Sequence, residues 1–255
     1  MSGCRLWGLF LSLWFCPLVW AAETPGLPGQ IRLVSEVWLD YTNADGSGLA
    51  WDVLREVFEP LGVKVETRSE PYLRSVGLVE RGEADAWVGS YSKEISGVLY
   101  PRWNFDTDHI YALGLASNPA PSLETLGAYR LAWVRGYKYQ NYLPNAHHFN
   151  EIRRRDGILS MLRHSRADYY IDALTEVDYV LSQAPDPSVF RRTHLVELPL
   201  YLGFSDSERG RALLALYDRR MDELVKGARL RKLFERWKQP YPFESGAPAA
   251  TDQTY

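Results

Sequence analysis

The sequence contains few cysteines: of its 255 residues, only Cys4 and Cys16 carry a thiol, and both lie close to the N-terminus. The rest of the chain therefore has no pair of cysteines that could form a disulfide. This absence excludes the small secreted domains that rely on disulfides instead of a large hydrophobic core. It is compatible with an exported bacterial protein that folds in the periplasm.

Long hydrophobic runs are also scarce, and the clearest one lies in residues 1–22. Arg5 precedes an apolar run over residues 6–19, and the small residues Ala21 and Ala22 follow it. This layout is typical of a secretory signal peptide, and the run is too short for a comfortable membrane span. We predict cleavage near Ala21 and a periplasmic mature protein; the alternative is an uncleaved anchor.

An excess of basic residues is missing as well. The 29 Lys and Arg residues are outnumbered by 32 Asp and Glu residues, which gives a formal net charge of −3. This balance gives no reason to expect nucleic acid as a partner. With 46% hydrophobic and 24% charged residues, the composition is that of an ordinary globular protein with enough apolar side chains for a core.

Motifs for several catalytic and cofactor-binding chemistries are absent. The sequence has neither a phosphate-cradling GxxxxGK(S/T) nor a nucleophile-elbow GxSxG. The loop around Gly46 is not an EF-hand calcium loop, because Tyr41 stands where the acidic first ligand belongs. His147 and His148 are adjacent rather than at helical ligand spacing, and no cysteine lies near them. We expect neither a cofactor nor a metal site.

Strand and helix patterns alternate along the chain, which predicts a parallel sheet with helical crossovers. We expect strands at 31–38, 63–70 and 84–91, and helices at 49–62 and 71–82. A similar series follows, with strands at 128–136, 148–152 and 167–173 and helices at 137–143, 154–165 and 174–183. In both series a helix is followed by Ala-Asp and an apolar strand, at Asp85 and, 83 positions later, at Asp168.

Two extended apolar segments, 109–117 and 194–205, bracket the second series and are expected to cross between two lobes. The helical stretch 207–237 would then return to complete the first lobe. The predicted organisation is a signal peptide at 1–22, a first lobe at 23–113 that resumes at 201–243, a second lobe at 114–200, and a disordered tail at 244–255.

The order and spacing of these segments resemble the bacterial extracytoplasmic solute-binding proteins of family 3, the amino-acid type. DGSGLAWDVLREVFEPLGVKVE is similar to that family's opening loop, first helix and second strand. PYLRSVGLVERGEADAWVGSY is similar to its Pro-aromatic-x-Arg helix and site-lining strand, and YRLAWVRG and LRHSRADYYIDA resemble strands of its second lobe. The resemblance implies an α/β, type II periplasmic binding fold, with two lobes, a mostly parallel sheet in each, and two hinge crossings.

In such a fold the carboxyl ends of the strands face the cleft. Gly89, Ser90 and Tyr91 end one such strand, where Ser90 and the backbone at Gly89 can hydrogen-bond an acceptor such as a carboxylate. Asp172 ends the matching strand, and the resemblance implies that it pairs with a ligand amino group; a salt bridge within its lobe is the alternative. The aspartates at the strand beginnings are interpreted as structural residues.

Five further residues are candidate ligand contacts. Trp38 and Tyr41, near the end of the first strand, can stack on an apolar or cationic part of the ligand, although a core position is the alternative for Trp38. Arg74 matches the arginine of the Pro-aromatic-x-Arg motif, with a surface position as the alternative. Arg135 and Gly136 end a strand where the N-terminus of the next helix favours an anion.

One departure from the family pattern concerns the ligand. Many members carry Thr-x-x-Arg shortly after the position of Tyr91, and its arginine grips an α-carboxylate. Here the stretch SYSKEISG offers Lys93 and Glu94 instead. Either Arg74 or Arg135 replaces the missing arginine, or the ligand lacks an α-carboxylate, as a polyamine or another small amine does.

The resemblance implies a non-enzymatic receptor, expected to act as a monomer, whose lobes close on a small polar solute. Its expected partner is an inner-membrane ABC permease. Two alternatives stay open. One is a sensing subunit for a membrane signalling protein, and the other is a periplasmic dehydratase or lyase, because a few proteins of this fold, such as the periplasmic cyclohexadienyl dehydratase, became enzymes.

Overall fold

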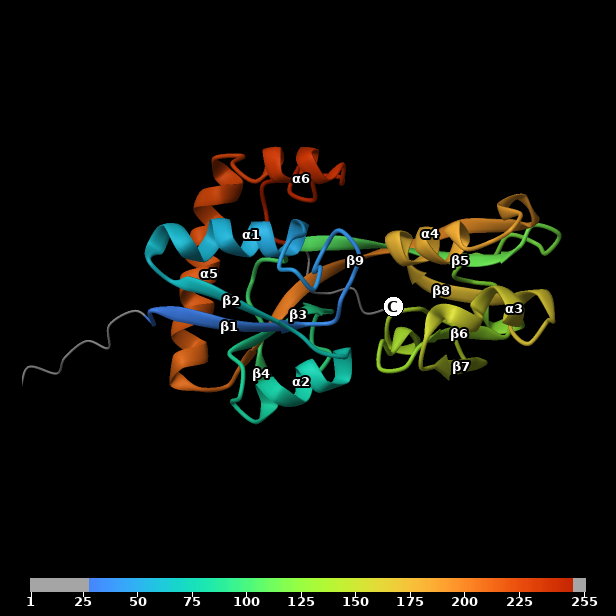
Figure 1. Ribbon diagram of the computed structural model, residues 1–255, viewed down its shortest axis with the longest axis horizontal. Coiled ribbons are helices and arrows are strands. Elements are labelled where there is room, and N and C mark those ends of the chain that lie inside the picture. Colours follow the sequence, from blue (N-terminus) through green and yellow to red (C-terminus); the bar gives the residue numbers. More distant parts are fainter. Residues whose placement is uncertain (1–27, 250–255) are drawn as a thin grey trace, which may run out of the picture.

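The computed structural model describes residues 28–249 (Figure 1). The predicted signal peptide, 1–22, and the last residues of the predicted tail, 250–255, lie outside the described residues. Within residues 28–249, no helix combines the length and the apolar character that a bilayer span needs.

The first lobe is built on the alternating segments predicted for the N-terminal half. Its elements are β1 (Gln30–Ser35), α1 (Leu49–Phe58), β2 (Lys64–Ser69), α2 (Tyr72–Glu80) and β3 (Ala86–Ser90). Strand β1 pairs in parallel with both β2 and β3, as the predicted crossovers require. Helix α1 buries its predicted apolar face and continues as a 3-10 turn, Glu59–Leu61, to Gly62, whose φ of 78° suits glycine.

The second lobe repeats the arrangement. Its elements are β6 (Leu131–Val134), β7 (Phe149–Ile152), α3 (Ile158–Arg163), β8 (Tyr169–Ala173) and α4 (Leu174–Ser182). Strand β6 pairs in parallel with β7 and β8, and all four of its residues are buried. The helix predicted at 137–143 is only a 3-10 turn at Tyr139–Asn141.

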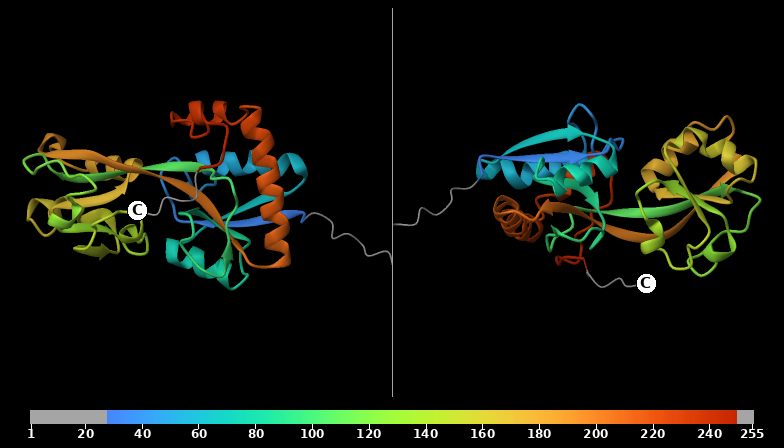
Figure 2. Two further views of the ribbon diagram at one scale, coloured as in Figure 1. Left: turned by 180° about the vertical axis from the view of Figure 1, so that it is seen from behind. Right: turned by 90° about the horizontal axis from the view of Figure 1, so that it is seen from below.

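Two long antiparallel strands, β5 (Asp106–Leu115) and β9 (Phe190–Ser205), join the lobes (Figure 2). The sheet order is β2-β1-β3-β9-β5-β8-β6-β7, and the short β4 (Val98–Leu99) pairs with β9. Strand β3 contacts β9 only from residue 201 onward, and β8 contacts β5 only from residue 110. Between these points residues 106–109 and 197–200 pair with each other alone among the described strands. We call this two-stranded connection the hinge ribbon.

The predicted lobe boundaries both fall on these two strands. The boundary at 200/201 coincides with the end of the hinge ribbon, whereas 113/114 lies in the part of β5 that already pairs with β8. After β9, α5 (Glu208–Lys226) and α6 (Arg231–Trp237) pack on the first lobe (Figure 1). Phe243 is buried there, and Glu244, assigned to the tail by the sequence, pairs with Arg231 at 2.8 Å.

The repeated Ala-Asp step has the same structural role in both lobes. Asp85 accepts a hydrogen bond from the backbone N–H of Arg32 (2.8 Å) and pairs with its guanidinium (2.8 Å). Asp168 does the same with the backbone N–H (2.7 Å) and guanidinium (2.7 Å) of Arg130. Each aspartate thus fixes the start of one strand to the strand beside it. The interpretation of both as structural residues is confirmed.

Asp85→Ala should lower the free energy of unfolding by about 1–3 kcal/mol, because it removes a buried acceptor of charged hydrogen bonds from Arg32 and Arg209 while both cations remain half-exposed to water. Burial raises the pKa of Asp85, but the hydrogen bonds from the two arginines lower it by more, so the pKa lies below its ordinary value. The stabilisation should therefore be present above pH 4 and fade as the pH falls below the carboxyl's ordinary value. Urea unfolding measures it, with the exposed Glu83→Ala as control; equal stability of both variants would contradict the assignment.

Candidate ligand-binding site

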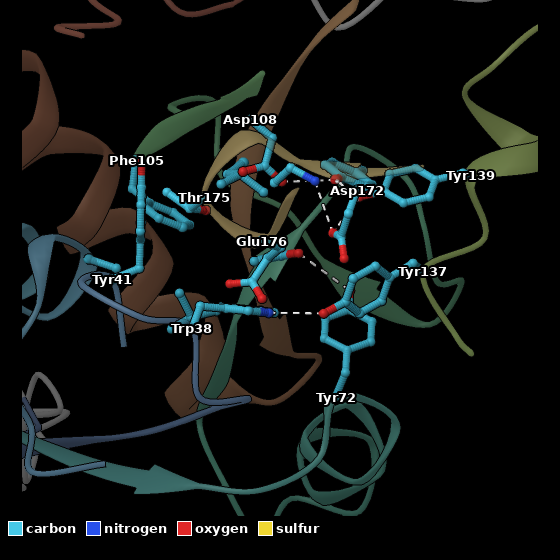
Figure 3. A pocket seen from close by; sticks show the side chains of 16 residues that line it. Trp38, Tyr41, Tyr72, Phe105, Asp108, Tyr137, Tyr139, Asp172, Thr175 and Glu176 are labelled. Atoms are coloured by element: carbon cyan, nitrogen blue, oxygen red, sulfur yellow. Dashed lines mark hydrogen bonds between the residues drawn. The ribbon is translucent and has the colours of Figure 1, made fainter. Parts of the chain in front are cut away.

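A cavity of about 50 Å³ lies between the two lobes, beside the hinge ribbon (Figure 3). One buried water needs about 10–15 Å³ of such space, so this cavity holds a few ligand or water atoms. Both lobes and the ribbon contribute to its wall. The lining residues are Trp38, Tyr41, Ala50, Tyr72, Val88, Gly89, Tyr91, Phe105, Asp108, Tyr137, Tyr139, Asp172, Ala173, Thr175, Glu176 and Leu200.

Aromatic side chains close the cavity by touching across the cleft. The indole N–H of Trp38 donates to the hydroxyl of Tyr137 at 2.9 Å (Figure 3). The rings of Tyr72 and Tyr137 meet edge-on with centroids 5.7 Å apart, and Tyr91 meets Tyr142 at 4.8 Å. Trp38, Tyr72 and Tyr91 belong to the first lobe and their partners to the second. The structure therefore describes lobes that are closed on each other.

Carboxylates outnumber cations around this cavity. Asp108 comes from the hinge ribbon, Asp172 ends β8, Glu176 lies in the first turn of α4, and Glu36 follows β1. The Arg155 guanidinium pairs with Asp172 at 3.0 Å, Glu176 at 3.1 Å and Glu36 at 3.8 Å. Asp108 accepts a hydrogen bond from the Tyr91 hydroxyl at 2.9 Å and has no ion pair within the described residues. One guanidinium thus pairs with three carboxyl groups, of which Asp172 and Glu176 line the cavity, and the third lining carboxyl group, Asp108, has no cation partner among the described residues.

Burial and the neighbouring charges shift the pKa values of these groups. The pKa of Asp108 is raised to about 7. Burial raises it most, the hydrogen bond from Tyr91 lowers it, and the negative charge of Asp172 raises it. Burial also raises the pKa of Glu176 to about 7, with Arg155 lowering it and Asp172 raising it. Burial lowers the pKa of Arg155, but the surrounding negative charges raise it by more, so the guanidinium stays charged. The cavity is therefore suited to a cation.

Five of the predicted contact residues line the cavity: Trp38, Tyr41, Gly89, Tyr91 and Asp172. Gly89 has φ of 89°, and a Cβ there would lie 2.4 Å from the Trp38 ring. Glycine is thus needed for the close approach of the indole in this closed arrangement, and the approach of a ligand to the Gly89 backbone stays a prediction. Asp172 lines the cavity and also forms the intralobe salt bridge that the sequence left as an alternative.

Ser90 does not line the cavity. Val88, Gly89 and Tyr91 do line it, and the register between β3 and β9 shifts between Val88 and Ser90, so the side chains do not alternate regularly at this strand end. Its buried hydroxyl donates to Glu94 at 3.0 Å and lies 3.3 Å from the Tyr100 hydroxyl. The prediction placed all three strand-end residues at the ligand and could not include this irregularity in the strand pairing.

The other three predicted contacts also lie outside the cavity. Arg74 is exposed and pairs with Glu70 at 3.1 Å, its alternative surface position. Arg135 is exposed as well, on the outer side of the strand end. Gly136 is buried against Leu73 of the first lobe, so closely that a Cβ would lie 2.7 Å from that side chain. Gly136 thus lies in the contact between the two lobes. Neither arginine lines the cavity, where the arginine of the family pattern would be expected.

The sequence prediction missed Asp108, Arg155, Glu176, Tyr137 and Tyr139. Two signals were available: the YKY segment that follows the YRLAWVRG strand places Tyr137 and Tyr139 at the cleft, and Glu176 lies one helical turn after Asp172. Asp108 gave no signal apart from its place before a crossing strand. Arg155 gave none, because it precedes α3 and reaches the cleft only through the folding of that loop.

The architecture is that of the two-lobed periplasmic binding proteins. No protein-family model matches the sequence, and no curated protein matches it either. Solved structures with this fold superpose over most of the chain. A histidine kinase sensor domain similar to periplasmic binding proteins has a TM-score of 0.69 at 15% identity, covering 82% of this chain and 96% of its own.

Two further solved structures show the range of proteins with this fold. An ancestral arginine-binding protein bound to arginine has a TM-score of 0.66 at 16% identity and covers 83% of this chain and 99% of its own. An ancestral amino-acid-binding protein that is a precursor of cyclohexadienyl dehydratase has a TM-score of 0.63 at 17% identity, with coverages of 82% and 95%. At these identities the likeness establishes the fold, so the resemblance to family 3 is supported by fold similarity.

Proposed function

We propose that this protein is a periplasmic solute-binding protein that captures a small amine in its interlobe cleft and delivers it to an ABC-type transporter. The observation that carries the proposal is the cavity lined by three carboxyl groups and an aromatic wall, in which the one nearby guanidinium is already paired with two of these carboxyl groups. Carboxylates and aromatic faces together are a favourable environment for an ammonium group. In proteins with this fold the ligand lies between two lobes that close on it by hinge motion.

A free amine or polyamine fits this site better than an ordinary α-amino acid. An α-carboxylate needs a cation, and the Arg155 guanidinium is already held by Asp172 and Glu176 at 3.0 and 3.1 Å. Arg74 and Arg135, the candidate replacements, lie outside the cavity. A carboxylate ligand would therefore have to displace a buried ion pair, whereas an ammonium group adds a partner for Asp108.

Two other functions have specific support. The likeness to a histidine kinase sensor domain supports a role as a ligand sensor for a membrane signalling protein. The pKa values near 7 of Asp108 and Glu176 would suit general acid–base catalysis, and the likeness to a dehydratase precursor supports an enzyme of that class. Both alternatives use the same cleft, so ligand binding is the property to establish first.

A thermal-shift screen identifies the ligand class and separates a binding protein from an enzyme. The panel contains polyamines, monoamines, amino acids, organic acids and sugars at pH 7.5. A ligand at 100 times its dissociation constant adds about 2.7 kcal/mol, which corresponds to a rise in Tm of roughly 5–10 °C for a domain of this size. An amine recovered unchanged supports the proposal, and a consumed ligand supports the enzyme. A response to organic acids or sugars alone would contradict the proposal.

Asp108→Asn should weaken the binding of an amine by about 10–100-fold, because it removes one charged hydrogen bond at the cavity. The Tm of the ligand-free protein should stay equal or rise, since Asp108 has no ion pair to lose. Isothermal titration calorimetry measures the affinity. The exposed Asp178→Asn, on α4 away from the cavity, is the matched control. Unchanged affinity in Asp108→Asn would place the ligand elsewhere.

A further inference from the structure

A second cluster of potential ligand atoms lies on the hinge ribbon, on the side away from the cavity. Along β5, Asp108 faces the cavity, so alternation turns its neighbour His109 to the opposite face of the ribbon. His109 is opposite Glu197 of β9 in the strand register. Its Nδ1 lies 3.3 Å from the Glu197 Oε1. His194, also on β9, completes the cluster.

A β-bulge brings the third residue to this face. Ile110 is opposite Val196 and Tyr111 is opposite His194, so Leu195 is an extra residue in β9. In a regular strand two residues three positions apart point to opposite faces. One extra residue between them brings both to the same face. His194 and Glu197 are accordingly both exposed, while Val196 between them is buried. The bulge is what places two imidazoles and a carboxylate side by side.

The geometry points to a binding site for a divalent zinc-like cation formed by His109, His194 and Glu197. One donor atom from each residue lies within 4.8 Å of the other two. In a tetrahedral zinc site with bonds of about 2.0–2.2 Å, neighbouring donors are about 3.3–3.5 Å apart, so the His109–Glu197 pair already fits. The His194 ring is exposed, and binding would draw its donor atom, now within 4.8 Å of the other two, to the same spacing.

The donor set selects the class of ion. Two imidazoles and one carboxylate suit zinc and the neighbouring late transition metals, whereas calcium and magnesium prefer oxygen ligands. The fourth position remains for water. The sequence-based expectation of no metal rested on the adjacent pair His147 and His148, and it could not include residues that only the pairing of β5 with β9 brings together.

The location gives the ion a mechanical consequence. His109 and Glu197 form the last residue pair of the hinge ribbon, and His194 lies just inside the second lobe. A bound cation cross-links β5 and β9 at the point where no other described strand supports them. Zinc should therefore stiffen the hinge, and the backbone amides of residues 106–109 and of Glu197, Leu198 and Leu200 should exchange more slowly with solvent deuterium when it is bound.

Calorimetric titration of the full chain with Zn²⁺ tests the site. The protein carries no histidine tag, and Cys4→Ser and Cys16→Ser remove the thiols. We expect one ion per chain at pH 7.5 and a rise in Tm of about 5 °C at saturation. His194→Ala and His109→Ala should each weaken binding by about 10–100-fold or more. His147→Ala/His148→Ala is the control and should bind like the parent.

Two results would overturn the site: no binding with Zn²⁺ up to about 100 µM at pH 7.5, or affinity that His194→Ala leaves unchanged. His194 is exposed, so His194→Ala should have the parent's Tm without metal, which separates loss of ligation from loss of folding. Substitution by Co²⁺ gives an independent readout, because four-coordinate cobalt absorbs visible light more strongly than six-coordinate cobalt. A six-coordinate spectrum, or one that His194→Ala does not change, would also count against the proposal.

Discussion

Arg155→Met is expected to lower the free energy of unfolding by about 3–5 kcal/mol at pH 7.5. Breaking a buried ion pair by removing one partner leaves an uncompensated charge, and costs of this size are typical. Here the substitution leaves Asp172, Glu176 and Glu36 facing one another without their cation. Methionine keeps much of the side-chain length, so the loss reports charge more than volume.

Urea unfolding of the parent and of Arg155→Met measures this effect. The exposed Arg135→Met is the matched control, for which a change below about 0.5 kcal/mol is expected. At pH 5 the penalty in Arg155→Met should be smaller, because protonated carboxyl groups no longer need a cation. A loss below 1 kcal/mol at pH 7.5, or the same loss at both pH values, would show that Arg155 does not hold the carboxylates together.

The free energy of unfolding of the ligand-free protein should fall by about 5 kcal/mol between pH 5 and pH 8 through Asp108 and Glu176, about 2.5 kcal/mol from each group. In the folded protein the pKa of each carboxyl group is raised to about 7, so the folded state binds more protons than the unfolded state between pH 4 and pH 7. Stability from these groups is therefore complete at low pH and is lost as the pH rises through 7.

The double variant Asp108→Asn/Glu176→Gln isolates this contribution, because neither amide titrates. Its free energy of unfolding, measured in urea at four pH values from 5 to 8, should fall less than that of the parent by the stated amount. If the two profiles are parallel, the carboxyl groups do not carry raised pKa values. An ammonium ligand should reduce the parent's pH dependence as well, because it supplies the missing positive charge near neutral pH.

The sequence predicted much of the cleft because strand ends and cleft coincide in this fold. Gly89, Tyr91 and Asp172 were found from the ends of two strands, and Trp38 and Tyr41 from the end of a third. The same reasoning did not place Ser90, whose hydroxyl bonds Glu94 outside the cavity, or Arg135, whose side chain is exposed and pairs with Glu151. A strand's end can be located from the pattern more easily than the direction of each side chain.

The sequence by itself determined the order of the strands and helices, the two similar lobes and the two crossing segments, because hydrophobic periodicity and the Gly and Pro positions act locally. Only the tertiary structure decided which charges meet. Arg155 joins Glu36 and Asp172 through a loop that no periodicity describes, and a single extra residue, Leu195, turns His194 toward His109. Such contacts depend on the closure of the lobes and on the local phase of a strand, and both are set by packing between segments far apart in the chain.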